Sequence, residues 1–298
     1  MKNKLFKLLC IIVILYCTNL LSVSMVYNFR IAQITKQFNL ENEENNTTII
    51  ALLYDEFFKK STGETQNFAG PFGTLIFKHE SFYLRMDTAY AHITNKKDNL
   101  ITYSGNQTDD ILFTLGYNFY KKHHHLMTFS GLFGLPTHKI HALQHTDFGY
   151  AQNSFGLQFD GSYSYNQDRK NILLYGARYI RFIPRIANDI NDTKYKFSTG
   201  NLVDLFIANK NTFGNHGLEY GYTLKFDFGA KVYPNFSNII EKINYIRSNF
   251  YAVYKYNFKI KDIENKLFLN LGYGFDHVPK TFGNKYIITL WGAWNITF

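Results

Sequence analysis

Charged residues of both signs stand at alternate positions between aromatic and aliphatic residues; Arg85 with Asp87 and Lys225 with Asp227 are two examples. Side chains two apart on a β-strand point to the same face. The charges would therefore gather on one side, as six of each sign. Such a surface can select solutes in a water-filled passage through a transverse field, or can close a narrow interior with ion pairs. The set comprises Arg85, Asp87, Asp160, Arg178, Lys196, Asp204, Glu219, Lys225, Asp227, Lys255, Lys266 and Asp276.

The elements that carry these charges are segments of strict alternation. In residues 155–165 the odd positions hold Phe, Leu, Phe, Gly, Tyr and Tyr, against Gly, Gln, Asp, Ser and Ser. This period of two predicts β-strands with one apolar and one polar face. The first of about twelve such segments could instead line one side of a helix with its Ile, Leu and Phe residues. The segments span residues 47–58, 68–79, 81–93, 109–121, 124–134, 153–166, 170–183, 195–208, 215–231, 246–259, 264–276 and 284–298.

The composition favours the membrane form of a barrel over the soluble form. The chain has 29 Phe and 23 Tyr, which suit lipid, whereas the small and charged residues suit a crowded polar lumen. Beyond the N-terminus no apolar run is long enough for a membrane helix, so a spanning structure must be a closed barrel. Short connections, such as Glu80, 210–214 and 260–263, also alternate with long ones, such as 94–108 and 184–194, as expected for periplasmic turns and external loops.

The N-terminus reads as a secretory signal. Lys2, Lys4 and Lys7 precede an apolar stretch that ends near the small-residue step Ser22–Ser24, so we expect cleavage before Met25. Removing the three lysines lowers the formal charge from +9 to +6, which is too mild and scattered to indicate nucleic acid. Both cysteines of the chain lie in the removed segment, which excludes disulfides and cysteine nucleophiles from the mature protein.

The last residues, Leu290-Trp-Gly-Ala-Trp-Asn-Ile-Thr-Phe298, form an amphipathic strand that closes on Phe. This ending resembles the C-terminal signal of bacterial outer-membrane proteins. The resemblance implies that the barrel-assembly machinery reads Trp294, Ile296 and Phe298.

A second resemblance concerns the segment Gly131-Leu-Phe-Gly-Leu-Pro-Thr137, followed by Gly149-Tyr-Ala-Gln-Asn153. It is similar to the outer-membrane channel-like family linked to the meta pathway of phenol degradation, although His138 stands where that family has glycine. The resemblance implies a small hydrophobic or aromatic solute.

The sequence contains residues for two further kinds of chemistry. The histidines at 123–125 and His138, His141 and His145 would need fixed converging geometry to bind a metal, and we expect solvated turn and loop residues instead. A hydrolase at the external rim has its ingredients in His92, Asp276 and His277, although no His-x-Ser-Asn-Gly element occurs.

We therefore expect an all-β fold, a transmembrane antiparallel barrel of about 12 strands with both termini in the periplasm. Residues 1–24 are the expected signal peptide, 25–46 a periplasmic lead-in, and 47–298 the barrel. The expected function is a channel or transporter in the bacterial outer membrane that passes or binds a small solute. We expect outer-membrane lipid, the assembly machinery and the solute as partners, and no cofactor, metal, nucleic acid or catalytic residue. A rim hydrolase and a closed structural or surface-interaction barrel are the alternatives.

Overall fold

The computed structural model describes residues 46–60, 63–108, 110–122, 124–137, 153–166, 168, 170–188, 194–198, 200–234, 241–278 and 284–297. The expected signal peptide, most of the expected lead-in, the histidines at 123, 138, 141 and 145, and Phe298 lie outside these residues. No helix long and apolar enough to cross a membrane occurs in the described part. The strands are β1 (Asn46–Lys60), β2 (Thr65–His79), β3 (Phe82–Lys97), β4 (Leu100–Thr108), β5 (Ile111–Lys122), β6 (His125–Leu135), β7 (Ser154–Ser164), β8 (Asn171–Phe182), β9 (Arg185–Asn188), β10 (Lys194–Ser198), β11 (Asn201–Phe213), β12 (His216–Pro234), β13 (Glu241–Ile260), β14 (Ile263–Val278) and β15 (Asn284–Thr297).

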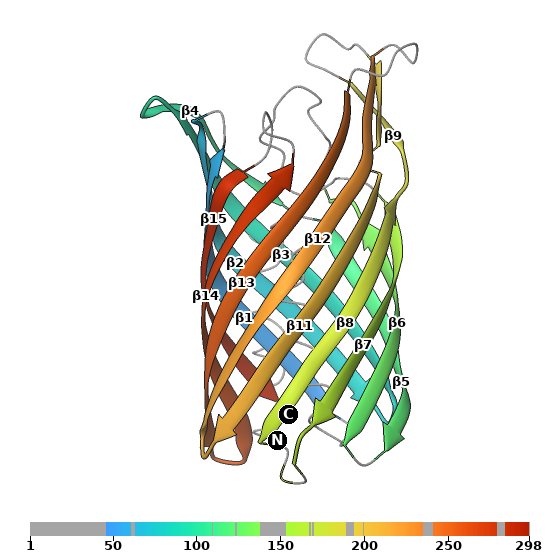
Figure 1. The fold of residues 1–298 in the computed structure, drawn as a ribbon, viewed down its shortest axis with the longest axis vertical. Helices are drawn as coiled ribbons and strands as arrows, with labels where there is room; N and C mark the ends of the chain where they lie inside the picture. The colour runs from blue at the N-terminus through green and yellow to red at the C-terminus, as the bar shows by residue number, and fades with distance from the viewer. Residues whose placement is uncertain are drawn as a thin grey trace, which may run out of the picture.

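Twelve of these strands close into an antiparallel barrel (Figure 1), as the alternation predicts. The ring runs β1-β2-β3-β5-β6-β7-β8-β11-β12-β13-β14-β15, and pairing between β1 and β15 completes it. The first segment, whose residues could have formed a helix, is strand β1. Closure pairs every barrel strand with two neighbours and leaves no free edge along the wall.

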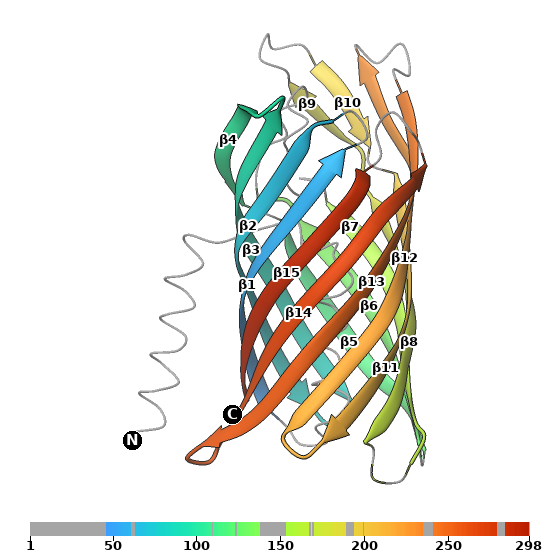
Figure 2. The same ribbon diagram turned by 60° about the vertical axis from the view of Figure 1, so that its left-hand side comes forward.

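The two ends of the barrel differ. Short turns join the strands at one end, which we call the turn end; Glu80, Gly214 and Lys261 in these turns have positive φ. β1 begins and β15 finishes at this same end. At the other end, which we call the loop end, the connections are longer, and β4, β9 and β10 extend beyond the wall (Figure 2).

Alternation places one face of each strand inside the barrel. In β5, Leu112, Thr114 and Gly116 are buried, whereas Leu115 and Tyr117 are exposed on the outer surface. Burial alternates along the strand with the same period of two as the sequence pattern. The pattern therefore predicts which positions face the lumen.

Two expected loops contain strands. Residues 94–108 form the top of a hairpin of β3 and β4, turned by Asp98 and Asn99, both with positive φ. Such a pair suits the tight turn of a hairpin, because Asp and Asn tolerate left-handed backbone better than most residues. Residues 184–194 likewise contain β9 and the start of β10, which pairs with the far end of β12.

The eighth expected segment, 195–208, is wrong in its bounds. β11 runs from Asn201 to Phe213, and residues 194–198 belong to the short strand β10 instead. The turn expected at 210–214 is therefore confined to Gly214 and Asn215. The polar run Asn-Lys-Asn-Thr at 209–212 resembles a loop, but its alternate residues continue the inward and outward faces of β11.

Candidate functional site

A row of inward positions, all polar except Gly116, connects the two ends of the lumen and is here called the polar row. It follows the cross-strand pairing through ten neighbouring strands: β2, β3, β5, β6, β7, β8, β11, β12, β13 and β14. Barrel strands are tilted by roughly 35–45°, so a row at right angles to them climbs as it winds around the wall. Lys78 lies at its turn end and Asp276 at its loop end. Its members are Lys78, Tyr83, Gly116, Ser130, Gln158, Arg178, Asp204, Lys225, Arg247 and Asp276.

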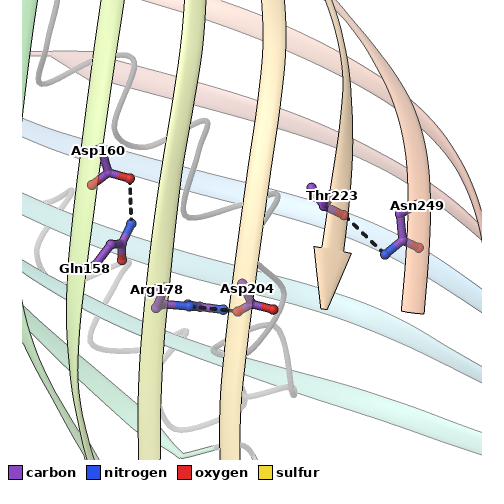
Figure 3. A network of polar contacts seen from close by, with 6 residues as sticks. All are labelled: Gln158, Asp160, Arg178, Asp204, Thr223 and Asn249. Carbon is purple, nitrogen blue, oxygen red and sulfur yellow. Dashed lines mark hydrogen bonds and ion pairs between the residues drawn. The ribbon is translucent and has the colours of Figure 1, made fainter. Parts of the chain in front are cut away.

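The centre of the polar row is an ion pair between β8 and β11. Nε of Arg178 donates to Oδ2 of Asp204 at 2.9 Å, and Nη2 donates to the same oxygen at 2.5 Å. The exposed fractions of the two side chains are 0% and 3%. On the next strand, β7, the amide of Gln158 donates to Asp160 Oδ1 at 3.0 Å (Figure 3). The Arg178–Asp204 contact joins two adjacent strands, whereas the Gln158–Asp160 contact runs along one strand. The predicted charges Asp160, Arg178 and Asp204 are all buried.

A second ion pair lies within β3. Nε of Arg85 donates to Oδ1 of Asp87 at 2.8 Å, and the Thr74 hydroxyl on β2 donates to the same oxygen at 2.5 Å. Both charged side chains are buried. The predicted charges Arg85 and Asp87 therefore neutralise each other in the lumen.

Tyr83 reaches along the polar row over a glycine. Its hydroxyl lies 2.8 Å from Ser130 Oγ on β6, across Gly116 of β5. A Cβ built on Gly116 would lie 2.0 Å from Tyr83 Cε1, so the ring needs a residue without a side chain beneath it.

At the loop end the row finishes in a partly exposed ion pair. Nε and Nη2 of Arg247 donate to Oδ1 and Oδ2 of Asp276 at 2.6 and 3.1 Å. The Arg247 guanidinium also lies 5.9 Å from the ring centroid of Phe58 on β1. Charge and aromatic surface thus meet at this mouth, and the sequence analysis did not single out Arg247.

A basic group occupies the lumen at the turn end. Lys255 and Lys266, both predicted from the sequence, are buried here near the predicted Glu219, whose Oε1 accepts a hydrogen bond of 2.8 Å from Tyr251. Lys210 belongs to the same group, because it is paired in register with Glu219 and interacts electrostatically with the other two lysines. Lys210 was missed because a turn was expected there, although its spacing from Asp204 already placed it on the inward face.

Three predicted charges are less well defined. Lys225 is half-buried and lies between Asp204 and Arg247 in the cross-strand register. The side chains of Lys196 and Asp227 lie outside the described part of the structure.

An apolar strip runs beside these charges on the inner wall. Its members are paired in register from β14 through β15, β1 and β2 to β3, and all are buried; they are Phe268, Ala293, Leu52, Phe72 and Ala89. Trp291 and Ile50 flank this strip within the same buried cluster. A second apolar cluster, of Leu112, Leu132, Ile180, Phe182 and Leu202, lies toward the loop end. The alternation predicted a polar lumen, and neither apolar cluster was expected from it.

The ingredients of a rim hydrolase do not assemble. His277 Nε2 lies 2.5 Å from Ser248 Oγ, but Asp276 faces the lumen and is held by Arg247, so it cannot orient that histidine. Ser248 is itself buried. His92 contacts Asn106 and Ser104 on the β3–β4 hairpin. Within the described residues no group of three His, Cys, Asp or Glu could hold a metal ion.

The outer surface is apolar and rich in aromatic residues. Leu269 and Leu271 on β14 are exposed, and aromatic pairs lie toward both ends, such as Phe82–Tyr117 at the turn end with ring centroids 4.6 Å apart. Trp294 is exposed on this face and Ile296 is half-buried. Apolar surface bordered by aromatic girdles is typical of barrels in lipid.

No protein-family model and no curated protein matches this sequence. Solved structures do match by fold. An outer-membrane channel from Pseudomonas putida F1 superposes with a TM-score of 0.64 at 11% identity, covering 85% of this chain and 96% of that chain. The β domain of the Bordetella autotransporter BrkA (TM-score 0.48, 9% identity, 85% and 100% covered) and a deletion variant of the monoaromatic hydrocarbon channel TodX (0.44, 8%, 86% and 91%) also match. At such identities the likeness concerns the fold, and the chain has the fold of a bacterial outer-membrane β-barrel.

Proposed function

We propose that this protein is a narrow channel of the bacterial outer membrane that passes or binds one small hydrophobic or aromatic solute at a time. The observation that carries the proposal is the apolar strip inside the barrel. Barrel channels for ions and hydrophilic solutes have a polar interior, whereas here Phe72 and Phe268 lie buried in the lumen. An apolar wall beside a polar row offers a solute both dispersion contacts and hydrogen bonds.

The narrow lumen favours a selective channel over a general pore. Arg178, Asp204 and Asp87 in the lumen are nearly inaccessible, although a wide water-filled pore would expose them. We infer that a solute passes in close contact with the side chains of the lumen. Ion pairs along the wall, such as Arg178–Asp204, can keep their contacts while it does so, because both partners belong to adjacent strands.

The test is ion current through the refolded barrel in a planar lipid bilayer. We expect small steps of current that cyclohexanol reduces and inositol, which has the same ring with six hydroxyls, does not. Phe72→Ala should weaken the block by cyclohexanol, because it removes apolar contact from the strip. Leu269→Ala, on the outer surface, is the matched control and should leave the block unchanged.

Two results would contradict the proposal. One is absence of current from a barrel whose folding is confirmed by its heat-dependent mobility on a gel. The other is current that both solutes reduce equally, which would indicate a lumen without an apolar site.

A further inference from the structure

Three neighbouring rows of inward side chains meet at the turn end of the lumen, on strands β11 to β15 and β1. They combine positive charge, hydrogen-bond donors without partners and apolar surface. The first row holds Lys210, Glu219, Val253, Asn270 and Trp291; the second holds Lys255, Phe268, Ala293 and Leu52; the third holds Lys266, Asn295 and Ile50.

The charge of this region is positive. Lys210, Lys255 and Lys266 are all buried, and Lys210 interacts with the other two and with Glu219. Glu264 also faces this group, but 45% of its side chain is exposed and it lies 3.9 Å from Lys259. Three buried lysines against one buried carboxylate form a surface that attracts an anion, and the low dielectric of the lumen strengthens that attraction.

The second observation is a set of buried donors that no side chain or backbone group satisfies. Asn270 is fully buried, and neither its nitrogen nor its oxygen has a hydrogen-bond partner. Nε1 of Trp291 and Nδ2 of Asn295 are also without partners, in side chains that are 1% and 0% exposed. Leaving a buried polar group unpaired is energetically unfavourable, because the group has lost its hydrogen bonds to water. Asn270 is paired with Trp291, and Asn295 is paired with Lys266, so the donors lie on both sides of the second, apolar row.

The third observation is the apolar surface that begins beside the charges. Phe268 is paired in register with Lys255, and Ala293 and Leu52 continue the apolar strip from there. The indole of Trp291 presents an unpaired N–H and belongs to the same buried apolar cluster. The rest of a ligand bound at the lysines would therefore contact these apolar side chains.

We propose that this region binds an amphipathic monoanion, a carboxylate attached to a small apolar ring or chain. The carboxylate accepts hydrogen bonds from Lys255, Lys266 and Nδ2 of Asn295, which is paired with Lys266, and the apolar body lies along Phe268 and Leu52 toward Trp291. The proposal rests on the proposed function, whose solute it narrows to an organic anion. The site lies at the turn end, so it would hold the solute at the end of its passage from the loop end.

The chain offers its own reporter for this site. Trp291 and Trp294 are the only tryptophans in the sequence, and Trp294 is exposed on the outer surface. Trp294→Phe therefore leaves Trp291 as the sole tryptophan. We would titrate this full-length refolded variant with cyclohexanecarboxylate, which does not absorb where tryptophan does, and follow the fluorescence.

The expected result is a saturable change with cyclohexanecarboxylate. Its neutral isostere cyclohexanecarboxamide should bind at least tenfold more weakly, because it lacks the charge, and so should acetate, because it lacks the ring. Lys255→Met and Lys266→Met should each weaken binding of the carboxylate about tenfold, a loss typical of one charged hydrogen bond. Lys266→Arg should restore most of it. Lys170→Met, which removes an exposed lysine at the same end, is the control and should have no effect.

Equal binding of the carboxylate and the carboxamide would overturn the proposal, and so would equal binding of acetate and cyclohexanecarboxylate. Conductance measured on the same preparation separates this outcome from failure of the channel itself. A barrel that conducts but does not bind the carboxylate refutes this site alone, whereas one that binds it but never conducts refutes the channel.

Discussion

Replacing Asp204 with alanine removes the oxygen that two nitrogens of Arg178 contact. The guanidinium side chain is 0% exposed, so the variant leaves a positive charge in the wall of the lumen without this partner. Breaking a buried ion pair from one side costs about 3–5 kcal/mol. An exposed pair would cost less than about 1 kcal/mol. The free energy of unfolding therefore reports whether this part of the lumen is closed to water.

The measurement is urea unfolding of the barrel in lipid vesicles, followed by tryptophan fluorescence. With a slope of about 2–3 kcal/mol per molar urea, the loss of about 3–5 kcal/mol in Asp204→Ala should lower the midpoint by about 1–2.5 M. The double variant Arg178→Met with Asp204→Ala should recover much of the loss, because a buried pair can often be replaced by apolar side chains at little cost. Asp276→Ala is the comparison at the loop end, where its partner Arg247 is 24% exposed, and it should cost less.

The reasoning fails if Asp204→Ala shifts the midpoint no more than Asp276→Ala does. It also fails if the loss of stability in the double variant equals the sum of the losses in Arg178→Met and Asp204→Ala measured singly. The two residues would then act independently.

Two further predictions concern the packing inside the barrel and the lipid outside it. Gly116→Ala should destabilise the barrel by about 1–3 kcal/mol, because its Cβ would meet the ring of Tyr83 at 2.0 Å; Gly131→Ala, which has no atom within 4 Å of the added Cβ, should be nearly neutral in the same urea unfolding. Leu269→Arg should cost about 2–4 kcal/mol if this residue, 56% exposed on the outer surface, lies at the middle of the bilayer. Ile260→Arg, at the end of β13, should cost no more than about 1 kcal/mol. Equal losses at both positions would show that Leu269 does not lie deeper in the bilayer than Ile260.

The alternation of side chains predicted the barrel and its strand number, because a period of two over segments of this length indicates β-strands. It also placed Arg178 and Asp204 on the inward face, opposite to the outward residues next to them in each strand. The same pattern could not show that these two residues contact each other, because the partner of a strand depends on its register with a neighbour. Asp98 and Asn99 are typical turn residues and form the turn between β3 and β4. This hairpin was not predicted, because residues 94–108 were expected to be a single loop.

The character of the lumen was harder to predict. Trp291 lies in the same terminal segment as Trp294, and the segment was interpreted through its outward residues. The inward position of Trp291 follows from its odd spacing to Trp294, but its unpaired N–H depends on what β14 and β1 place around it. Likewise, Phe72 and Phe268 are far apart in the sequence, and only the order of the strands in the closed ring makes them parts of one strip.

The seam between β1 and β15 also sets the order of events when the barrel forms. The hydroxyls of Thr48 and Thr297 lie 3.3 Å apart although 249 residues separate them. Local hairpins can form quickly, whereas a contact of such long range forms slowly because the intervening chain must first be organised. Until then β1, with 15 residues, and β15, with 14 residues, each have one unpaired edge. Such edges can pair with other chains. A variant that weakens this seam should therefore slow insertion and promote aggregation before it changes any property of the finished barrel.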